Sequence, residues 1–172
     1  MEGCCLIKPG PADAGAVDAL AKKWRAFGGR MHPGLLRAYE GDYGAFLKLL
    51  SDWEAGVGVG REAPQTLYLL KRGDGEILGA VALRHYLNET NLTDGGHVGY
   101  GVCPEYRGLG YGSEILRLAL ERLREMGVTR ALVTCEETNA LSRSVILHNG
   151  GTLENSTFDE DGVPIERYWI DI

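Results

Sequence analysis

The stretch that most constrains the fold runs from His97 to Glu137 and contains an apolar strand, a glycine-rich loop, an amphipathic helix and a second apolar strand. A strand–helix–strand unit of this length joins two parallel strands through a right-handed crossover. The helix carries one apolar stripe and is closed by Gly127. The stripe consists of Ile115, Leu116, Ala119, Leu120, Leu123 and Met126. We therefore expect an α/β domain with a parallel strand pair at its centre.

Two helices are expected before this unit, because apolar residues recur there at helical spacing. The first helix lies between Pro11 and Gly28, and the second begins at Asp42, a good helix-capping residue. Residues 31–41 between these helices are expected to be irregular. The polar stretch 88–96 is expected to be a loop.

The remaining segments predict strands and one short helix. Residues 4–8 form a short apolar run, and residues 65–87 contain two apolar runs separated by a glycine-rich turn, as in a β-hairpin. A helix is expected to begin at Asn139, and two final strands should flank a turn at residues 159–164. Without a linker or an internal repeat, residues 1–172 are expected to form a single mixed-sheet domain.

Charge and hydropathy exclude some classes of partner. The chain has 172 residues, 44% hydrophobic residues and a net charge of −6, and an acidic protein is a poor match for a nucleic acid backbone. No apolar run approaches the roughly 20 residues that span a bilayer. The N-terminal stretch MEGCCLIKPG has an acidic second residue and no long apolar core, so it is a poor signal peptide. We expect a cytoplasmic protein with no nucleic acid or membrane partner.

The cysteines and histidines give no sign of a metal site. The four cysteines form no C-x-x-C pair, and the four histidines show no H-E-x-x-H or similar spacing. We therefore expect neither a disulfide framework nor a bound metal.

Three glycines before the long helix predict an anion site. Gly108, Gly110 and Gly112 let a ligand approach the backbone, and the first turn of a helix offers free N–H groups and a partial positive charge. A tight packing turn is the alternative. The spacing G-x-G-x-G does not match a dinucleotide-binding G-x-G-x-x-G, and no Gly-Lys-Ser/Thr follows as in a P-loop. A methyltransferase site fits poorly too, because Tyr106 stands where an acidic residue is needed.

The same segment supports a resemblance to a known family. V-C-P-E-Y-R-G-L-G-Y-G resembles the acetyl-CoA-binding segment of the GNAT superfamily of N-acetyltransferases, R/Q-x-x-G-x-G/A after a strand ending V-x-P. Arg107, Gly110 and Gly112 match its core positions. Asn139 opens a segment similar to the N-x-x-S/A helix of that family. The element order agrees over nearly the whole chain, and the pattern looks like a subgroup of bacterial acetyltransferases.

The resemblance implies the acyl-CoA N-acyltransferase fold, in which a mixed, mostly antiparallel sheet is flanked by helices and a central parallel strand pair splays apart. Acetyl-CoA is the implied co-substrate. Its pantetheine arm is expected to contact Tyr100, Gly101 and Val102 on one side and Asn139 on the other. Its pyrophosphate is expected on the backbone amides of Arg107, Gly108, Leu109, Gly110, Tyr111 and Gly112.

The catalytic groups are less clearly marked. Many relatives protonate the leaving sulfur with a tyrosine, but alignment on Asn139 puts Ile146 at that position, and isoleucine cannot donate a proton. Tyr100, Cys135, His148 or water are the alternatives. For the base, many relatives use a glutamate on the strand before the glycine loop. The strand here offers His97, whose ordinary pKa suits base catalysis near pH 7, or His97 is instead a structural hydrogen-bonding residue.

Other polar residues are expected around the acceptor. Glu136 and Glu137 could act as a base through water, although two acids at a strand end are more often a solvated rim. The family builds its acceptor pocket from the first two helices and their loop, which includes residues 31–34 here. Arg84 could bind a carboxylate of the acceptor.

These observations predict an acetyl-CoA-dependent N-acetyltransferase that acts on a primary amine of a small molecule or an amino-acid-like substrate. A protein amine is a further alternative. A non-catalytic acyl-CoA-binding or sensor domain is the second hypothesis, because the usual tyrosine and strand glutamate are missing. A methyltransferase is the third. Many relatives dimerise, so a homodimer through the last strands and Trp169 remains open.

Overall fold

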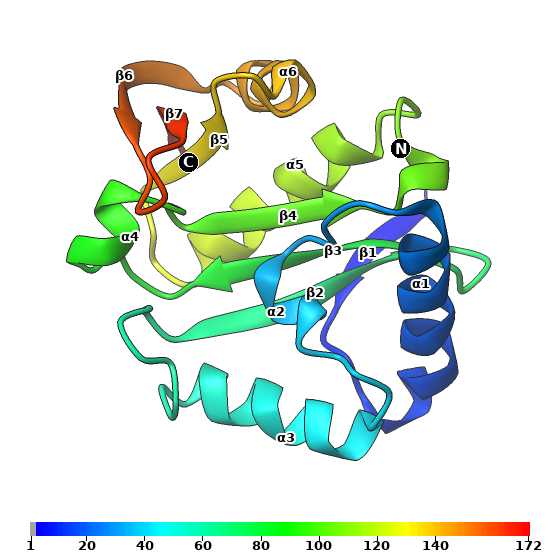
Figure 1. Cartoon of the computed structure of the whole chain (residues 1–172). Coiled ribbons are helices and arrows are strands. Elements are labelled where there is room, and N and C mark those ends of the chain that lie inside the picture. Colours follow the sequence, from blue (N-terminus) through cyan, green and yellow to red (C-terminus); the bar gives the residue numbers. More distant parts are fainter. Residues whose placement is uncertain (1–2) are drawn as a thin grey trace.

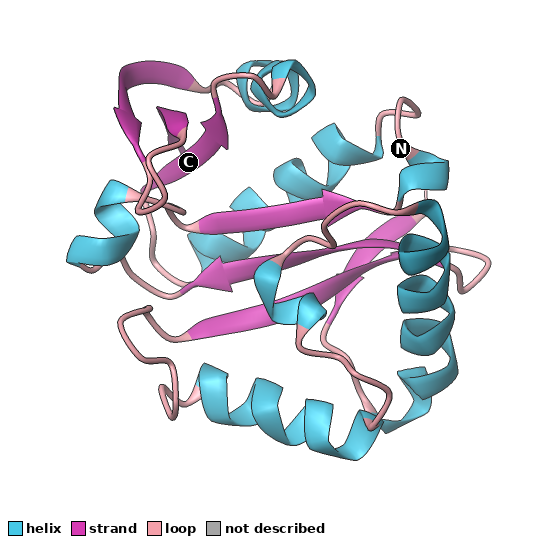
Figure 2. Cartoon of the chain, in the orientation of Figure 1, coloured by secondary structure: helices cyan, strands magenta, loops and turns pink. Residues whose placement is uncertain are grey.

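The structure is a computed structural model that describes residues 3–172; Met1 and Glu2, part of the N-terminal stretch considered above, lie outside the described residues. It contains two antiparallel sheets with helices around them (Figures 1 and 2). The first sheet has the order β1 (Cys4–Ile7), β2 (Gln65–Arg72), β3 (Ile77–Arg84) and β4 (Val98–Val102). The second has the order β5 (Arg130–Glu136), β7 (Pro164–Asp171) and β6 (Thr152–Phe158).

The helices cover both faces of the first sheet (Figure 1). Those on one face are α1 (Ala14–Phe27), α2 (Gly34–Arg37) and α3 (Tyr43–Glu54). The long helix α5 (Tyr111–Glu125) packs on the other face, where its apolar stripe joins residues of β5 and β7 in a second core. Two short helices, α4 (Glu89–Thr93) and α6 (Ala140–His148), follow β3 and β5. No helix within residues 3–172 is long and apolar enough to cross a membrane.

Helix ends follow the sequence signals in most places. The Asp42 side chain accepts a hydrogen bond from the Ala45 amide at 3.0 Å and so caps α3, as predicted.

Two expectations about the secondary structure were wrong. Residues 34–37, expected to be irregular, form α2, because Leu35 and Leu36 are buried against the sheet.

The second wrong expectation concerns the polar stretch 88–96, which contains α4 instead of being all loop. The Asn88 side chain caps this helix by accepting from the Asn91 amide at 2.9 Å. The Asn91 side chain is fully buried and accepts from the Ala63 amide, which fixes the helix to the rest of the domain.

The central strand pair differs from a single mixed sheet. β4 and β5 are the facing edges of two separate sheets, and no ladder joins them within the described residues. They meet at one point, where the His97 amide donates to the Leu132 carbonyl at 2.7 Å and the Leu132 amide donates to His97 Nδ1 at 3.0 Å. The ladder does not continue toward the C-terminal ends, because the His97 carbonyl accepts from the Arg84 amide at 2.9 Å and is not available to β5. The α/β class with flanking helices is as predicted. The central strands β4 and β5 diverge so far that they belong to separate sheets.

Candidate active site

The edge of β4 that faces away from β3 presents backbone groups that no other strand pairs with within residues 3–172. The Cys103 amide bonds the Leu78 carbonyl, and the register pairs Gly79 with Val102. Backbone groups in an antiparallel ladder alternate in direction, so Tyr100 and Val102 turn their N–H and C=O groups away from β3. We call this the open edge of β4. Gly101, predicted as a third contact, turns its polar groups toward β3 instead.

The glycine loop directly follows the open edge and ends at the N-terminus of α5. Gly108 and Gly110 have φ values of +76° and +85°, in the left-handed region that favours glycine. Gly112 differs, because it lies inside α5 with an ordinary φ and faces Val145 of α6. The turn therefore needs two of the three glycines for their backbone conformation and the third for close packing.

Five consecutive amides in this loop have no acceptor within residues 3–172. They belong to Gly108, Leu109, Gly110, Tyr111 and Gly112. The predicted contribution of the Arg107 amide does not fit, because that group donates to the Pro104 carbonyl at 3.2 Å. Together with the partial positive charge at the start of a 15-residue helix, the five donors have the arrangement that an anion site needs.

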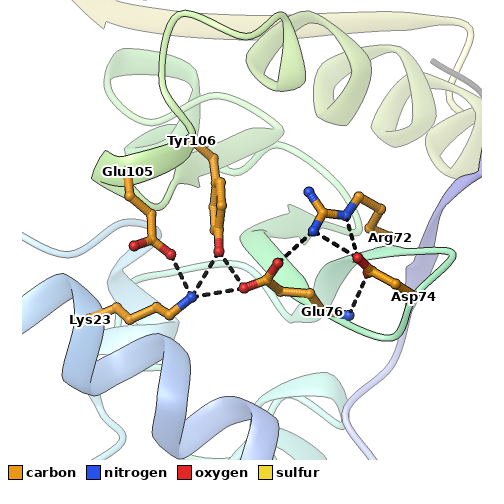
Figure 3. Close-up of polar contacts among 6 residues, drawn as sticks. All are labelled: Lys23, Arg72, Asp74, Glu76, Glu105 and Tyr106. Carbon is orange, nitrogen blue, oxygen red and sulfur yellow. Dashed lines mark hydrogen bonds and ion pairs between the residues drawn. The ribbon is translucent and has the colours of Figure 1, made fainter.

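A cluster of six side chains holds the segment in front of the loop in place (Figure 3). It consists of Lys23, Arg72, Asp74, Glu76, Glu105 and Tyr106. The Lys23 ammonium lies 2.8 Å from a Glu76 oxygen and 2.5 Å from a Glu105 oxygen. Arg72 donates to Glu76 from the other side at 2.6 Å. Since each carboxylate has a cationic partner, these acids repel an anion at the loop less than free carboxylates would.

Tyr106 connects this cluster to the loop. Its hydroxyl accepts from Lys23 at 2.8 Å and donates to Glu76. Burial and the neighbouring carboxylates raise the pKa of Tyr106 to about 12, so the hydroxyl keeps its proton. Its ring meets the Tyr111 ring edge-on, with centroids 6.4 Å apart. The loop is thereby held at both ends, by one residue before it and one at the start of α5.

The side chain of Tyr100 extends from β4 to the first turn of α6. Its hydroxyl shares a hydrogen bond of 3.1 Å with the Ser142 hydroxyl, which also interacts with the Cys135 thiol at the end of β5. Burial raises the pKa of Tyr100 to about 12 and, with the Glu166 carboxylate adding to it, the pKa of Cys135 to about 11. Both groups therefore hold their protons at neutral pH, and three proton-bearing groups meet beside the open edge.

Asn139 lies at the N-terminus of α6. Its side-chain oxygen accepts from the Ser142 amide at 3.0 Å, and its own amide donates to the Glu136 carbonyl at 2.9 Å. The side-chain oxygen of Asn139 therefore caps α6. Its NH₂ group is left for the predicted contact with the pantetheine arm.

Comparison with known proteins identifies the kind of protein to which this site belongs. Residues 31–150 match the acetyltransferase (GNAT) family. The chain belongs to this family. The resemblance seen in the sequence is confirmed, and so is the expectation of an acetyltransferase enzyme. No protein with a curated description matches the chain.

Solved structures share the fold of this GNAT protein at low sequence identity. The microcin C7 self-immunity acetyltransferase MccE, solved with acetyl-CoA and AMP, is 18% identical, with a TM-score of 0.69 over 100% of this chain and 94% of that chain. A Salmonella typhimurium acetyltransferase that modifies the N-terminal serine of ribosomal protein L7/L12 is 17% identical, with a TM-score of 0.69 over 100% and 96%. A spermidine N-acetyltransferase SpeG chimera from Vibrio cholerae and hSSAT is 14% identical, with a TM-score of 0.65 over 99% and 96%.

His97 is placed in the GNAT domain where base catalysis does not fit. The residue is 5% exposed, and Nδ1 accepts from the Leu132 amide, so the neutral ring carries its hydrogen on Nε2. Burial, with the Arg84 guanidinium adding to it, lowers the pKa of His97 to about 4. Because neither nitrogen has a free lone pair, the geometry favours the structural alternative over the catalytic one.

Arg84 also has a structural position. Its guanidinium donates to Glu62 at 2.7 Å and to the carbonyls of Gly95 and Gly96 at 3.0 and 3.2 Å. It therefore fixes the chain just before His97, and the predicted contact with an acceptor carboxylate does not fit. Ile146 is fully buried, in line with its inability to act as an acid.

For two polar residues of the site, the sequence marked the segment but not the contact that each residue makes. Ser142 stands third after Asn139, where the family pattern N-x-x-S/A marks it, but its contact with Tyr100 depends on a strand 42 residues away. His32 belongs to the predicted acceptor segment 31–34 and lies against Gly101 of β4. Within residues 3–172, no group of His, Cys, Asp and Glu side chains could hold a metal ion.

Proposed function

We propose that the protein transfers the acetyl group of acetyl-CoA directly to a primary amine of a small, amino-acid-like molecule. The observation that carries this proposal is the row of five free amides at the start of α5, directly after the open edge of β4. The amides suit a pyrophosphate, and the open edge suits an extended arm that pairs with it like an added strand.

The open edge also supplies a donor for the reaction. When an amine attacks a thioester, negative charge develops on the carbonyl oxygen, and a fixed N–H group stabilises it. The Val102 amide is the proposed donor, because it lies on the open edge at the end of β4 nearest the glycine loop. The Arg107 side chain donates to the Val102 carbonyl at 3.2 Å and holds this end of the strand in place.

Three arginines favour an acceptor that carries a negative charge. Arg30, Arg37 and Arg107 all lie within electrostatic reach of His32. Arg30 and Arg37 have no carboxylate partner within the part of the chain that the structure describes, and burial together with the Arg30 charge lowers the pKa of Arg37. Like charges placed together without ion-pair partners of their own favour an anionic ligand, so a carboxylate near the amine fits better than a polyamine.

The leaving sulfur is the proposed partner of Tyr100 and Ser142. A phenol whose pKa is about 12 does not transfer its proton completely to a thiolate, whose conjugate acid has a pKa near 8.5, but it can donate a hydrogen bond to the departing sulfur. The Tyr100→Phe variant should therefore lower kcat about 10-fold, less than the loss of a full acid catalyst, and leave acetyl-CoA affinity unchanged. Steady-state kinetics would measure kcat, and calorimetric titration would measure the acetyl-CoA affinity. An unaltered kcat would contradict this role.

Release of free thiol from acetyl-CoA tests the function itself. We expect turnover with amino acids or related carboxylated amines, and slower turnover with matched amines that lack the carboxylate. The competing hypothesis is an acyl-CoA sensor. It predicts saturable CoA binding without thiol release for any amine in a panel that includes peptides with free N-termini. The cytoplasmic location stays a prediction, and a homodimer stays open.

A further inference from the structure

The loop between α1 and α2 brings His32 to the open edge of β4. A Cβ atom placed on Gly101 would lie 2.7 Å from the Cβ and from the carbonyl oxygen of His32, and 2.8 Å from Trp24. Only glycine at position 101 lets this loop lie directly on the strand. His32 is thus held beside Tyr100 and Val102, whose backbone groups form the open edge.

The charged groups around His32 come from both sides of the site. Arg30 and Arg37 belong to its own loop and to α2, Arg107 follows β4, and Glu136 ends β5. Partial burial lowers the pKa of His32, the three arginines lower it further, and the Glu136 carboxylate raises it. His32 is an exposed residue, and because its pKa is lowered from 6.5 its ring is mostly neutral at pH 7, which leaves one nitrogen with a lone pair to accept a proton. His97 lacks this feature.

We propose that His32 is the general base that takes the proton from the acceptor ammonium. This inference rests on the proposed acetyl transfer and adds the residue that starts it. The loop places the imidazole on the acceptor side, where Arg30 and Arg37 would hold the carboxylate of the same molecule. Glu136, at the end of β5, would stabilise the imidazolium that forms.

The step is balanced in atoms and charge. His32 removes one proton from the ammonium, and the free amine attacks the thioester carbonyl, forming the C–N bond. The C–S bond then breaks, the nitrogen loses a second proton, and the CoA thiolate takes up one proton. One proton is left on His32 and passes to solvent. The products are the N-acetyl compound and free CoA, and no oxidant or further reactant is needed.

The test compares His32→Gln with the wild-type protein, using the best amine from the thiol-release panel. Loss of a positioned base should lower kcat about 100-fold or more. The acidic limb of the wild-type kcat profile should lie below pH 6.5, since the His32 pKa is lowered, and it should disappear in the variant. CoA affinity, measured by calorimetry, should be unchanged in the variant.

His85→Gln is the matched control. His85 is another histidine whose pKa is lowered by burial, but its Nε2 lies 2.9 Å from the Thr66 hydroxyl, and its charged neighbours are Glu54 and Lys8. This control should keep the wild-type kcat and pH profile. Unchanged kcat and pH profile in His32→Gln would overturn the inference and leave the proposed function intact. Absence of turnover by the wild-type protein would overturn both.

Discussion

Replacing Gly110 with valine should weaken CoA binding by about 10- to 100-fold, because the free amides of the glycine loop lose their arrangement. Gly110 has a φ of +85°, and a β-branched residue adopts this conformation only with strain. The substitution therefore acts on the backbone of the loop, whose conformation sets the direction of the free amides. Calorimetric titration with CoA would measure the loss.

Gly127→Val is the matched control for this prediction. Gly127 follows the C-terminus of the same helix and has a φ of +86°, close to the +85° of Gly110. Both variants should lower the free energy of unfolding by a similar amount, about 1–2 kcal/mol. Only the Gly110 variant should lose CoA affinity. Equal CoA affinity in the two variants would mean that the loop is a packing turn and not a phosphate site.

The glycine loop could be predicted from sequence because its signals are local. Positive φ at Gly108 and Gly110, the free amides and the start of α5 all lie within a few residues of one another. The exception, Gly112, is explained by Val145 of α6, a long-range contact at 3.1 Å from its ideal Cβ. The cap at Asn88 was also a local signal, and it would have identified α4 in the polar stretch.

The separation of the two sheets and the role of His97 could not be predicted in this way. His97 has the intrinsic pKa of a base, but its Nδ1 bonds an amide 35 residues further along the chain. Arg84 was likewise predicted to bind a carboxylate of the acceptor. The sequence could not show that its partners, Glu62 and Gly95, come from other segments of the chain. His32 is the reverse case, since it acquires a role only because the α1–α2 loop lies on Gly101.

His97→Phe should destabilise the protein by about 1–3 kcal/mol, because it leaves the buried Leu132 amide without an acceptor. Leu132 is fully buried, so water cannot easily replace the lost bond. His97→Asn is the matched variant: its side-chain oxygen stands at the same number of bonds from the backbone as Nδ1 and can accept from the same amide. It should recover most of the loss in denaturant unfolding. Equal losses in both variants would contradict the importance of this hydrogen bond.

The pH dependence of stability gives a second test of the contact between His97 and Leu132. The pKa of His97 is about 4 in the folded protein and about 6.5 in the unfolded chain, so the unfolded chain binds more protons between these values. The wild-type free energy of unfolding should therefore be highest above pH 6.5 and fall as the pH drops toward 4. Because asparagine does not titrate, His97→Asn should lose this part of the fall.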